Sequence, residues 1–356
     1  MKPVRVGLVG CGKVGQIHSA ALRSLPEAEF VAACDVDLNR AGMLGVRPFA
    51  NLAAMLREGG VEAVLIGTPH PLHADAAVMA AEAGVHVLVE KPMAATVADC
   101  DAMLAAARKS GVTLGVISQR RFFEPVQRMK TAIDADKIGT PALGVCLMYS
   151  WREPSYYASD PWRGKWDTEG GGVLVNQSPH QLDILLWLMG PAAEVSGYWA
   201  NVNHPTVEVD DTAVATVRFR NGGLGSIITS VSQKPGIYSK IHVHGTNGAS
   251  LGVETDRGAT FIAGVSTIAE PAMNDLWTVP GEEQMLNEFH AADRAKFLVV
   301  DATVHYHALQ IADFLRAVRE DRPPLVTGED GRAVVALFAA IYQSDRERRR
   351  IALSAS

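Results

Sequence analysis

Residues 4–15 read V-R-V-G-L-V-G-C-G-K-V-G, and this stretch decides how the first part of the chain folds. Its opening six residues are mostly β-branched or apolar, as in a buried strand. Gly10, Gly12 and Gly15 then form a G-x-G-x-x-G pattern, and a helical apolar period begins at Val14. We therefore predict a strand, a tight glycine turn and a helix in direct succession.

This turn has the features of a dinucleotide site. The first glycine permits the turn, the second lets the backbone approach a pyrophosphate, and the third allows close packing of helix on strand. Asp35 follows about 20 residues later, at the end of the second predicted strand, where a carboxylate accepts hydrogen bonds from the adenosine ribose. Its charge would repel a 2′-phosphate, so we predict NAD rather than NADP. The predicted cofactor contacts at the turn are Gly10, Gly12, Lys13, Val14 and Gly15.

Short β-rich runs alternate with helical patterns over the first 118 residues, which implies crossover connections and a parallel sheet. The runs are at 4–9, 30–34, 63–66, 85–89 and 113–117, and the helical patterns at 14–24, 52–58, 72–83 and 97–109. Beyond residue 120, β-rich segments follow one another without crossover helices, which favours antiparallel pairing. These segments are at 142–150, 193–202, 212–220, 225–231 and 241–245, with helical patterns at 125–133, 182–189, 307–320 and 331–348.

These patterns predict an α/β protein of two domains. Residues 1–121 are expected to form an NAD-binding Rossmann domain with a doubly wound parallel sheet. Residues 122–356 are expected to form an α+β domain with a large, mostly antiparallel open sheet, which binds substrate and supports oligomerisation. The chain of 356 residues is long enough for both cores.

Composition excludes several classes of protein. The net charge of -6 lacks the basic excess that a nucleic-acid protein needs. The N-terminus lacks the pattern of a secretory signal, and apolar stretches stay shorter than the ~18 residues of a membrane span. The 4 cysteines show no C-x-x-C spacing, so we interpret them as reduced thiols. We predict a cytoplasmic protein that binds neither nucleic acid nor membrane.

A second motif lies where another predicted strand ends. Residues 87–93 read V-L-V-E-K-P-M, so an apolar run ends in Glu90, Lys91 and Pro92. Ligands of open parallel sheets bind outside the carboxyl ends of the strands, so Glu90 and Lys91 are predicted to face the cofactor. Thr68 and Pro69 follow the preceding strand and are expected beside the cofactor, with His73 capping or packing at the start of the next helix.

Four motifs together resemble those of the Gfo/Idh/MocA oxidoreductases, over nearly the whole chain and in the same order and spacing. They are G-C-G-K-V-G (10–15), T-P-H-P-L-H (68–73), V-E-K-P (89–92) and G-G-G-V-L-V-N-Q-S-P-H-Q-L-D (170–183). The resemblance implies that Lys91 contacts the reacting hydroxyl and the nicotinamide side of the cleft. It also implies that His180 is the usual proton-transfer partner.

This chain departs from the family at position 176. Many members carry an aspartate four residues before the histidine, whereas this chain has Asn176. An amide does not take up a proton at neutral pH, so Asn176 is predicted to orient the substrate or His180 by hydrogen bonding. Pro179 prevents an undisturbed helix through this region, unless the helix begins there with Ser178 as its cap. Asp183 either fixes the imidazole tautomer or pairs with an arginine in the core.

Other candidates are weaker. Trp162 and Arg163 resemble a family segment that reaches back to the nicotinamide, and Gln119, Arg121 and His307 are candidate substrate contacts. The pairs His242/His244 and His305/His307 lack a convincingly spaced third ligand, so we predict no metal site. The aromatic stretch 149–166 either stacks on pyranose faces or forms a packed loop.

The resemblance implies an NAD-dependent dehydrogenase acting on CH-OH groups. It would transfer hydride between nicotinamide and a secondary hydroxyl of a sugar, glycoside or cyclic polyol, with His180 as the base and Lys91 polarising and relaying the proton. A homodimer or homotetramer is expected. Two alternatives stay open: a glycosidase that retains NAD and acts by transient oxidation and elimination, and a non-enzymatic NAD-binding regulator.

Overall fold

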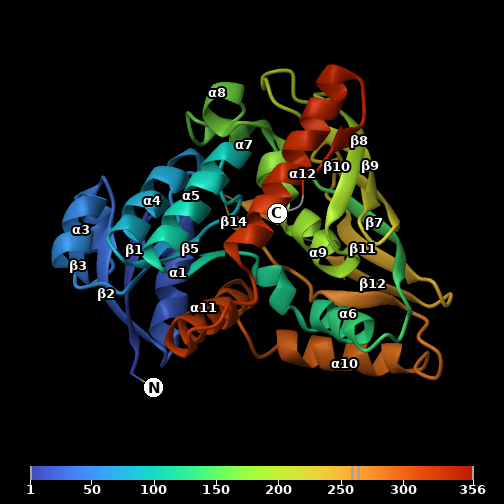
Figure 1. Cartoon of the computed structure of the whole chain (residues 1–356), viewed down its shortest axis with the longest axis horizontal. Coiled ribbons are helices and arrows are strands. Elements are labelled where there is room, and N and C mark those ends of the chain that lie inside the picture. The colour runs from blue at the N-terminus through green and yellow to red at the C-terminus, as the bar shows by residue number, and fades with distance from the viewer. Residues whose placement is uncertain (1, 258–259, 263–264, 355–356) are drawn as a thin grey trace. The chain divides into compact units, whose positions relative to one another are not determined.

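The computed structural model describes residues 2–257, 260–262 and 265–354, and the chain divides into two compact units (Figure 1). The first unit comprises Met1–Gln119 and Thr303–Val335, and the second comprises Arg120–Ala302 and Ala336–Ser356. The last of these three divisions falls inside one helix, α12 (Gly328–Glu347). The predicted boundary at residues 121 and 122 lies beside the first division, and it stays a prediction for independently folding domains.

The first unit is built on a parallel sheet, as the sequence predicted. Its strand order is β3-β2-β1-β4-β5-β6, and every pair is parallel. The order reverses between β1 and β4, and ligands of such sheets bind outside the strand ends at that point. The strands are β1 (Val4–Val9), β2 (Ala28–Cys34), β3 (Arg47–Phe49), β4 (Ala63–Ile66), β5 (His86–Val89) and β6 (Leu114–Val116).

Helices alternate with the strands of this sheet along the chain (Figure 1). They are α1 (Lys13–Ser24), α2 (Leu38–Gly42), α3 (Leu52–Glu58), α4 (His73–Glu82) and α5 (Val97–Ser110), with the short helix η1 (His70–Leu72). The short helix η2 (Gln119–Phe122) begins at the last residue of this stretch and continues into the second unit. Helix α5 shows why these segments are helical. The hydroxyl of Thr96 accepts from the backbone of Asp99 at its start, and Gly111 ends it in the left-handed conformation.

One helix of the first unit comes from much later in the sequence. Helix α11 (Ala302–Glu320) contributes Ile311, Phe314 and Leu315 to the same apolar cluster as Val6 and Leu8. The amide of Gln310 donates to the carbonyl of Val116 at 2.8 Å and accepts from the backbone of Ser118 at 2.8 Å. The core of the first unit therefore includes a segment that follows all strands of the second unit's large sheet except the last along the chain.

The second unit carries an eight-stranded sheet in the order β15-β12-β11-β7-β10-β9-β8-β16. Among the strand pairs that the structure describes in this sheet, only β7 with β10 is parallel, so the predicted mostly antiparallel sheet is confirmed. Its strands are β7 (Pro141–Tyr149), β8 (Ala192–Ala200), β9 (Thr212–Phe219), β10 (Leu224–Ser230), β11 (Tyr238–Gly245), β12 (Ser250–Thr255), β15 (Met273–Trp277) and β16 (Ile351–Ala352). Strands β13 (Thr260–Ile262) and β14 (Val265–Thr267) form a separate pair.

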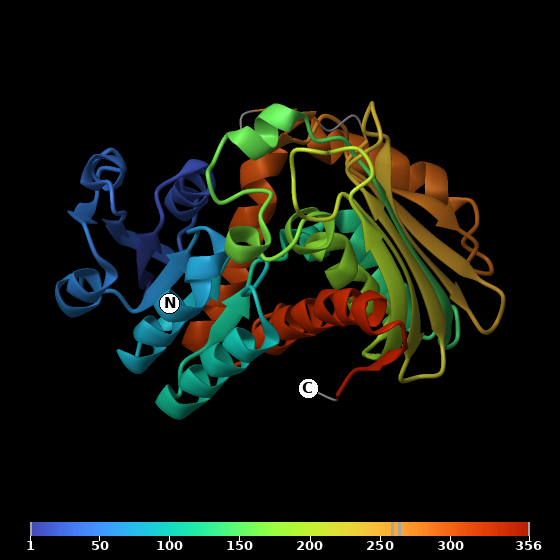
Figure 2. The same cartoon turned by 90° about the horizontal axis from the view of Figure 1, so that it is seen from above.

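Burial along this sheet alternates with a period of two. In β9, Ala213, Ala215 and Val217 are buried, whereas Val214 and Thr216 are exposed. Helix α9 (Pro179–Met189) and the end of α12 lie on the same side of the strands (Figure 2). The other helices of this unit are α6 (Glu124–Asp134), α7 (Pro154–Ala158), α8 (Trp166–Glu169), the π-helix η3 (Val173–Gln177) and α10 (Met285–Phe297). No helix within the described ranges is long and apolar enough to cross a membrane.

A buried ion pair fixes α9 in the second unit. Arg121, which is 2% exposed, donates to both carboxylate oxygens of Asp183, at 2.7 and 2.6 Å, and its guanidinium lies over the ring of Trp187. Of the two interpretations of Asp183, the structure shows pairing with a core arginine. The same pair keeps the Arg121 guanidinium inside the core, whereas the sequence had suggested it as a substrate contact.

Replacing Asp183 by asparagine should lower the free energy of unfolding by about 3–5 kcal/mol, because it leaves the buried Arg121 charge uncompensated. Asp134→Asn is the matched control, since Asp134 pairs with Lys130 on the surface and its loss should cost at most about 0.5 kcal/mol. Urea unfolding of both variants measures the difference. Equal losses in the two variants would contradict the assignment.

Candidate active site

The glycine turn after β1 is tightly packed at two of its three glycines. Gly10 has φ +90°, and a Cβ there would lie 2.8 Å from the backbone of Gly67. A Cβ on Gly15 would lie 2.3 Å from the carbonyl oxygen of Gly10. These two positions therefore require glycine for the turn itself and for the packing of α1 on β1.

Gly12 is different, because its surroundings leave room for a ligand. Among the described residues, nothing lies within 4 Å of a Cβ built on Gly12, and no side chain of the described chain caps the N-terminus of α1 there. Open space beside uncapped backbone N–H groups suits a phosphate. The side chain of Lys13 is exposed at this turn, and Val14 is half-buried.

Asp35 is held by the backbone at the end of β2. Its Oδ2 accepts from the N–H of Cys11 at 2.7 Å, and its Oδ1 accepts from the N–H of Asp37 at 2.9 Å. The carboxylate is thus fixed next to the glycine turn, where a ribose of a dinucleotide would lie. The residues present fit a dinucleotide cofactor.

A buried network of charged and polar groups surrounds Glu90, the residue before Lys91. The ring of His18, on α1, contacts Oε1 of Glu90 at 2.9 Å, and the backbone N–H of Lys91 donates to Oε2 of Glu90 at 3.0 Å. Burial alone would raise the pKa of Glu90, but the bond and charge of His18, with His307 and Lys91, outweigh it and lower the pKa to about 2. Glu90 is therefore a carboxylate at neutral pH.

His307 belongs to the same network. Its ring lies edge-on to that of His18, with 5.5 Å between the centroids, and its Nδ1 contacts the carbonyl oxygen of Thr303 at 2.7 Å. Burial lowers the pKa of His307 to about 4, and the charge of His18 acts in the same direction. His307 thus lies in the first unit beside His18, and its lowered pKa makes the ring neutral at neutral pH and charged only in acid.

His73 connects the segment after β4 to the end of β5. It is the first residue of α4, and its two ring nitrogens contact the carbonyl oxygens of Pro92 at 3.0 Å and Thr68 at 2.9 Å. Burial lowers the pKa of His73 despite these contacts. The ring packs at the start of the helix, as predicted, and it joins two segments that were expected beside the cofactor.

In the second unit, one carboxylate organises the triple-glycine motif. Asp210 is fully buried and accepts from the N–H of Gly172 at 2.7 Å, the N–H of Leu174 at 3.1 Å and the hydroxyl of Tyr342 at 2.6 Å. A Cβ on Gly172 would lie 1.8 Å from the carbonyl oxygen of Asp210, so only glycine fits there. Burial raises the pKa of Asp210, and the three donors oppose that shift.

The segment before His180 is a π-helix. The N–H of Ser178 donates to the carbonyl of Val173 at 2.9 Å, five residues earlier along the chain. Helix α9 then begins at Pro179, with Ser178 in the cap position, although its hydroxyl donates to Val173 at 2.8 Å instead of capping the helix. Asn176 therefore lies on the π-turn, and His180 lies in the first turn of α9. π-Turns of this kind are frequent at functional sites.

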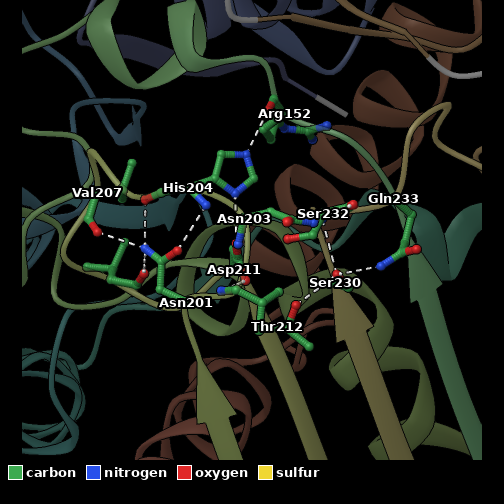
Figure 3. A network of polar contacts seen from close by, with 12 residues as sticks. Arg152, Asn201, Asn203, His204, Val207, Asp211, Thr212, Ser230, Ser232 and Gln233 are labelled. Atoms are coloured by element: carbon green, nitrogen blue, oxygen red, sulfur yellow. Dashed lines mark hydrogen bonds and ion pairs between the residues drawn. The ribbon is translucent and has the colours of Figure 1, made fainter.

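The loop 201–211, which carries Asp210, is held in place by the hydrogen-bond network in Figure 3. The ring of His204 contacts Asp211 at 2.8 Å through Nδ1 and the carbonyl of Arg152 at 2.8 Å through Nε2. The amide of Asn201 donates to three carbonyls of the same loop, those of His204, Val207 and Val209. Asp210, Asp211 and His204 were not among the residues predicted from the sequence, although the acidic pair directly before a β-rich run was a visible signal.

The predicted contacts Trp162 and Arg163 lie in the second unit. The guanidinium of Arg163 packs over the ring of Trp162 at 4.3 Å, and its Nη1 donates to the hydroxyl of Tyr156 at 2.5 Å. Gln177 donates to the same hydroxyl at 3.0 Å. His180 is buried at the start of α9.

The predicted site residues divide between the two units. The first unit holds Gly10, Gly12, Lys13, Val14, Gly15, Asp35, Thr68, Pro69, His73, Glu90, Lys91, Gln119 and His307. The second holds Arg121, Trp162, Arg163, Asn176 and His180. Within the part of the chain that the structure describes, no group of three or more His, Cys, Asp or Glu side chains is placed to hold a metal ion. His242 instead contacts Asp275 at 2.9 Å.

Comparison with known proteins identifies the family. A model described as an oxidoreductase family with an NAD-binding Rossmann fold matches residues 4–118, and its C-terminal alpha/beta domain matches residues 130–353. The chain therefore belongs to the Gfo/Idh/MocA oxidoreductase family, which confirms the resemblance.

Individual relatives cover nearly the whole chain. The crystal structure of the WlbA dehydrogenase from Bordetella pertussis in complex with NADH and UDP-GlcNAcA is 30% identical, with a TM-score of 0.85, covering 100% of this chain and 99% of that one. Myo-inositol 2-dehydrogenase from Thermotoga maritima is 26% identical, over 98% of each chain. D-apiose dehydrogenase from Paraburkholderia graminis is 27% identical, over 99% of this chain and 90% of its own.

The buried pair of His18 and Glu90 predicts a pH-dependent stability difference. Glu90→Gln should lower the free energy of unfolding at neutral pH by about 1.5–3 kcal/mol, because it removes a charged hydrogen-bond acceptor. The pKa of Glu90 is depressed from 4.5 to about 2 in the folded protein. The difference in unfolding free energy between wild type and variant should therefore be complete above pH 4.5 and disappear as the pH falls from 4.5 to about 2.

Denaturant unfolding at several pH values measures this difference. Glu29→Gln is the control, since Glu29 is an exposed carboxylate 4.0 Å from Arg5. A difference between wild type and Glu90→Gln that stays constant through the window would contradict the charged state of Glu90.

Proposed function

We propose that this member of the Gfo/Idh/MocA family is an NAD-dependent dehydrogenase that transfers hydride between nicotinamide and a secondary hydroxyl of a sugar, glycoside or cyclic polyol. The observation that carries the proposal is the open backbone at Gly12 beside the fixed carboxylate of Asp35, in a chain that also has Lys91 and His180. The names of the relatives, which include an inositol and an apiose dehydrogenase, support the substrate class.

In this proposal each side chain has a defined task. The bound cofactor supplies the hydride acceptor at its nicotinamide ring. His180 takes the hydroxyl proton during oxidation, and Lys91 donates a hydrogen bond to the reacting oxygen and relays the proton. The Glu90 carboxylate accepts from the backbone N–H of Lys91 and so fixes the start of that side chain. Asn176 orients the substrate by hydrogen bonding.

The finer assignments are also proposals. NAD is preferred to NADP because the Asp35 carboxylate would repel a 2′-phosphate. A homodimer or homotetramer is supported by exposed apolar side chains on the sheet of the second unit, Leu143, Tyr198, Val214 and Leu224. A cytoplasmic location is supported by the 4 cysteines, which are free and buried.

Replacing Asp35 by alanine should weaken NADH binding by about 10-fold to 100-fold, because a charged acceptor for the ribose is lost. It should also reduce the preference for NADH over NADPH, because the charge that repels the 2′-phosphate is removed. Asp37→Ala is the control, since that carboxylate accepts from the backbone of Asn39 at the surface. Titration with NADH and NADPH, followed by fluorescence, measures both preferences without a substrate. Equal effects of the two substitutions would contradict the assignment of Asp35.

Replacing Lys91 by methionine should lower turnover by at least about 100-fold while leaving NAD binding nearly intact, because the proton relay is lost and the backbone is kept. The assay is NADH appearance with NAD and NADP in parallel, against sugars, inositols, glycosides and sugar acids. Lys109→Met, at the exposed end of α5, is the control. Retained turnover in Lys91→Met would contradict the proposed role of Lys91. Hydrolysis without NADH formation would indicate a glycosidase instead.

A further inference from the structure

Glu169 is a buried carboxylate that the proposed chemistry does not yet use. It ends α8, is 1% exposed, and lies entirely within the second unit. Its Oε2 accepts from the backbone N–H of Gly164 at 2.5 Å, and its Oε1 accepts from Nδ2 of Asn176 at 2.5 Å. The carboxylate therefore connects the loop before α8 to the π-turn that carries Asn176.

The bond from Gly164 is fixed by the surrounding backbone. Gly164 has φ +75°, its carbonyl accepts from the N–H of Glu208 at 2.8 Å, and a Cβ there would lie 2.9 Å from Val207. The N–H is therefore aimed at residue 169 whatever side chain stands there. One oxygen of Glu169 is committed to it, and the other faces Asn176.

This geometry determines which end of the Asn176 amide faces Glu169. An ionised carboxylate only accepts hydrogen bonds, so the group that meets it must be the amide nitrogen. The oxygen and nitrogen of a carboxamide diverge from the same carbon, so Oδ1 of Asn176 is turned away from Glu169. The amide then offers an acceptor on the side opposite Glu169.

We infer that Glu169 is a positioning residue that orients the Asn176 amide, so that Oδ1 accepts the hydrogen bond of the substrate hydroxyl. The inference rests on the proposed function, because it assigns a task to Asn176 in alcohol binding. An alcohol ready for oxidation donates its proton, and an acceptor oriented in advance favours that state over a carbonyl compound. Asn176 thereby selects the direction from which the hydroxyl approaches.

The orientation depends on Glu169 being ionised. Burial raises the pKa of Glu169, while the bonds from Gly164 and Asn176 and the charge of Arg163 lower it. The charged and titratable groups that act on Glu169 are Arg163, Asp210, Tyr156, Tyr157 and Tyr342. If acid protonated Glu169, the carboxyl group would donate to Oδ1 and the amide would turn its nitrogen outward. Alcohol affinity should therefore fall at low pH through this group.

An exchange of amide and carboxylate tests the inference. In Glu169→Gln, the N–H of Gly164 donates to the side-chain oxygen at position 169, so the NH2 group of that side chain faces Asn176. The Asn176 amide should then turn its Oδ1 toward residue 169 and its Nδ2 toward the substrate. The KM for the alcohol should rise about 10-fold to 100-fold, because a donor then meets the hydroxyl proton. Adding Asn176→Asp to Glu169→Gln gives position 176 an acceptor oxygen toward residue 169 and a second acceptor oxygen toward the substrate. The KM should therefore return to within about threefold of wild type.

Three further variants and measurements complete the test. Asn176→Asp alone places two carboxylates in contact, so it should bind alcohol poorly at neutral pH and recover as pH falls. Glu208→Gln, the same change on the neighbouring loop where Glu208 accepts from the N–H of Trp166 at 3.3 Å, should leave the KM unchanged. NADH affinity should be equal in all variants. A double variant that stays as impaired as Glu169→Gln would overturn the inference.

The orientation can also be measured without any substrate. In protein labelled with 15N on asparagine side chains, the Asn176 signal is identified by its absence in Asn176→Asp. One of its two amide protons should be shifted downfield in wild type and in Glu208→Gln, and should lose that shift in Glu169→Gln. An unchanged signal in Glu169→Gln contradicts the inference. A wild type that oxidises no alcohol refutes the proposed function while this measurement still decides the orientation.

Discussion

The second unit depends on one buried carboxylate, Asp210, whose charge has to be satisfied away from water. An isolated ionised carboxylate in an apolar interior is very unfavourable, so donors must converge on it. Here they come from the triple-glycine turn, through Gly172, from the π-helix, through Leu174, and from α12, through Tyr342. That convergence holds the turn, the π-helix and the start of α9 in one arrangement, and Asn176 and His180 both lie on the segment that it fixes.

The first unit follows the same rule with a different partner. Glu90 directly follows a strand whose last three residues are buried, and it is stabilised there by His18 from the helix that follows the glycine turn. The pair connects the two segments that the sequence predicted around the cofactor, although they are far apart along the chain. In both units, a buried acid is satisfied mainly by groups distant in sequence, and the predicted functional residue lies directly beside that acid or on the segment that it holds.

The sequence predicted the local features well and the distant partners poorly. β1, α1 and the glycine turn follow from residues that are neighbours along the chain, so their pattern is readable directly. β3 was missed because its three residues include Pro48, and proline argues against a strand except at an edge, which is where β3 lies. The parallel pairing of β7 with β10 and the contact of His204 with Arg152 join remote segments, and Glu169 bonds to Gly164 and Asn176 across turns; no local period encodes those contacts. Helix α10 was also missed, and Asp293 is its only fully buried residue, so no run of buried apolar side chains marks it.

The position of α11 has a consequence for how the protein is made. The apolar cluster of the first unit needs Ile311, Phe314 and Leu315, and Gln310 bonds to the end of β6, yet these residues leave the ribosome only after every strand of the second sheet except β16. The unit that begins synthesis first is therefore completed nearly last. Until then its nascent sheet exposes an apolar surface, and the second unit has the opportunity to fold in the meantime.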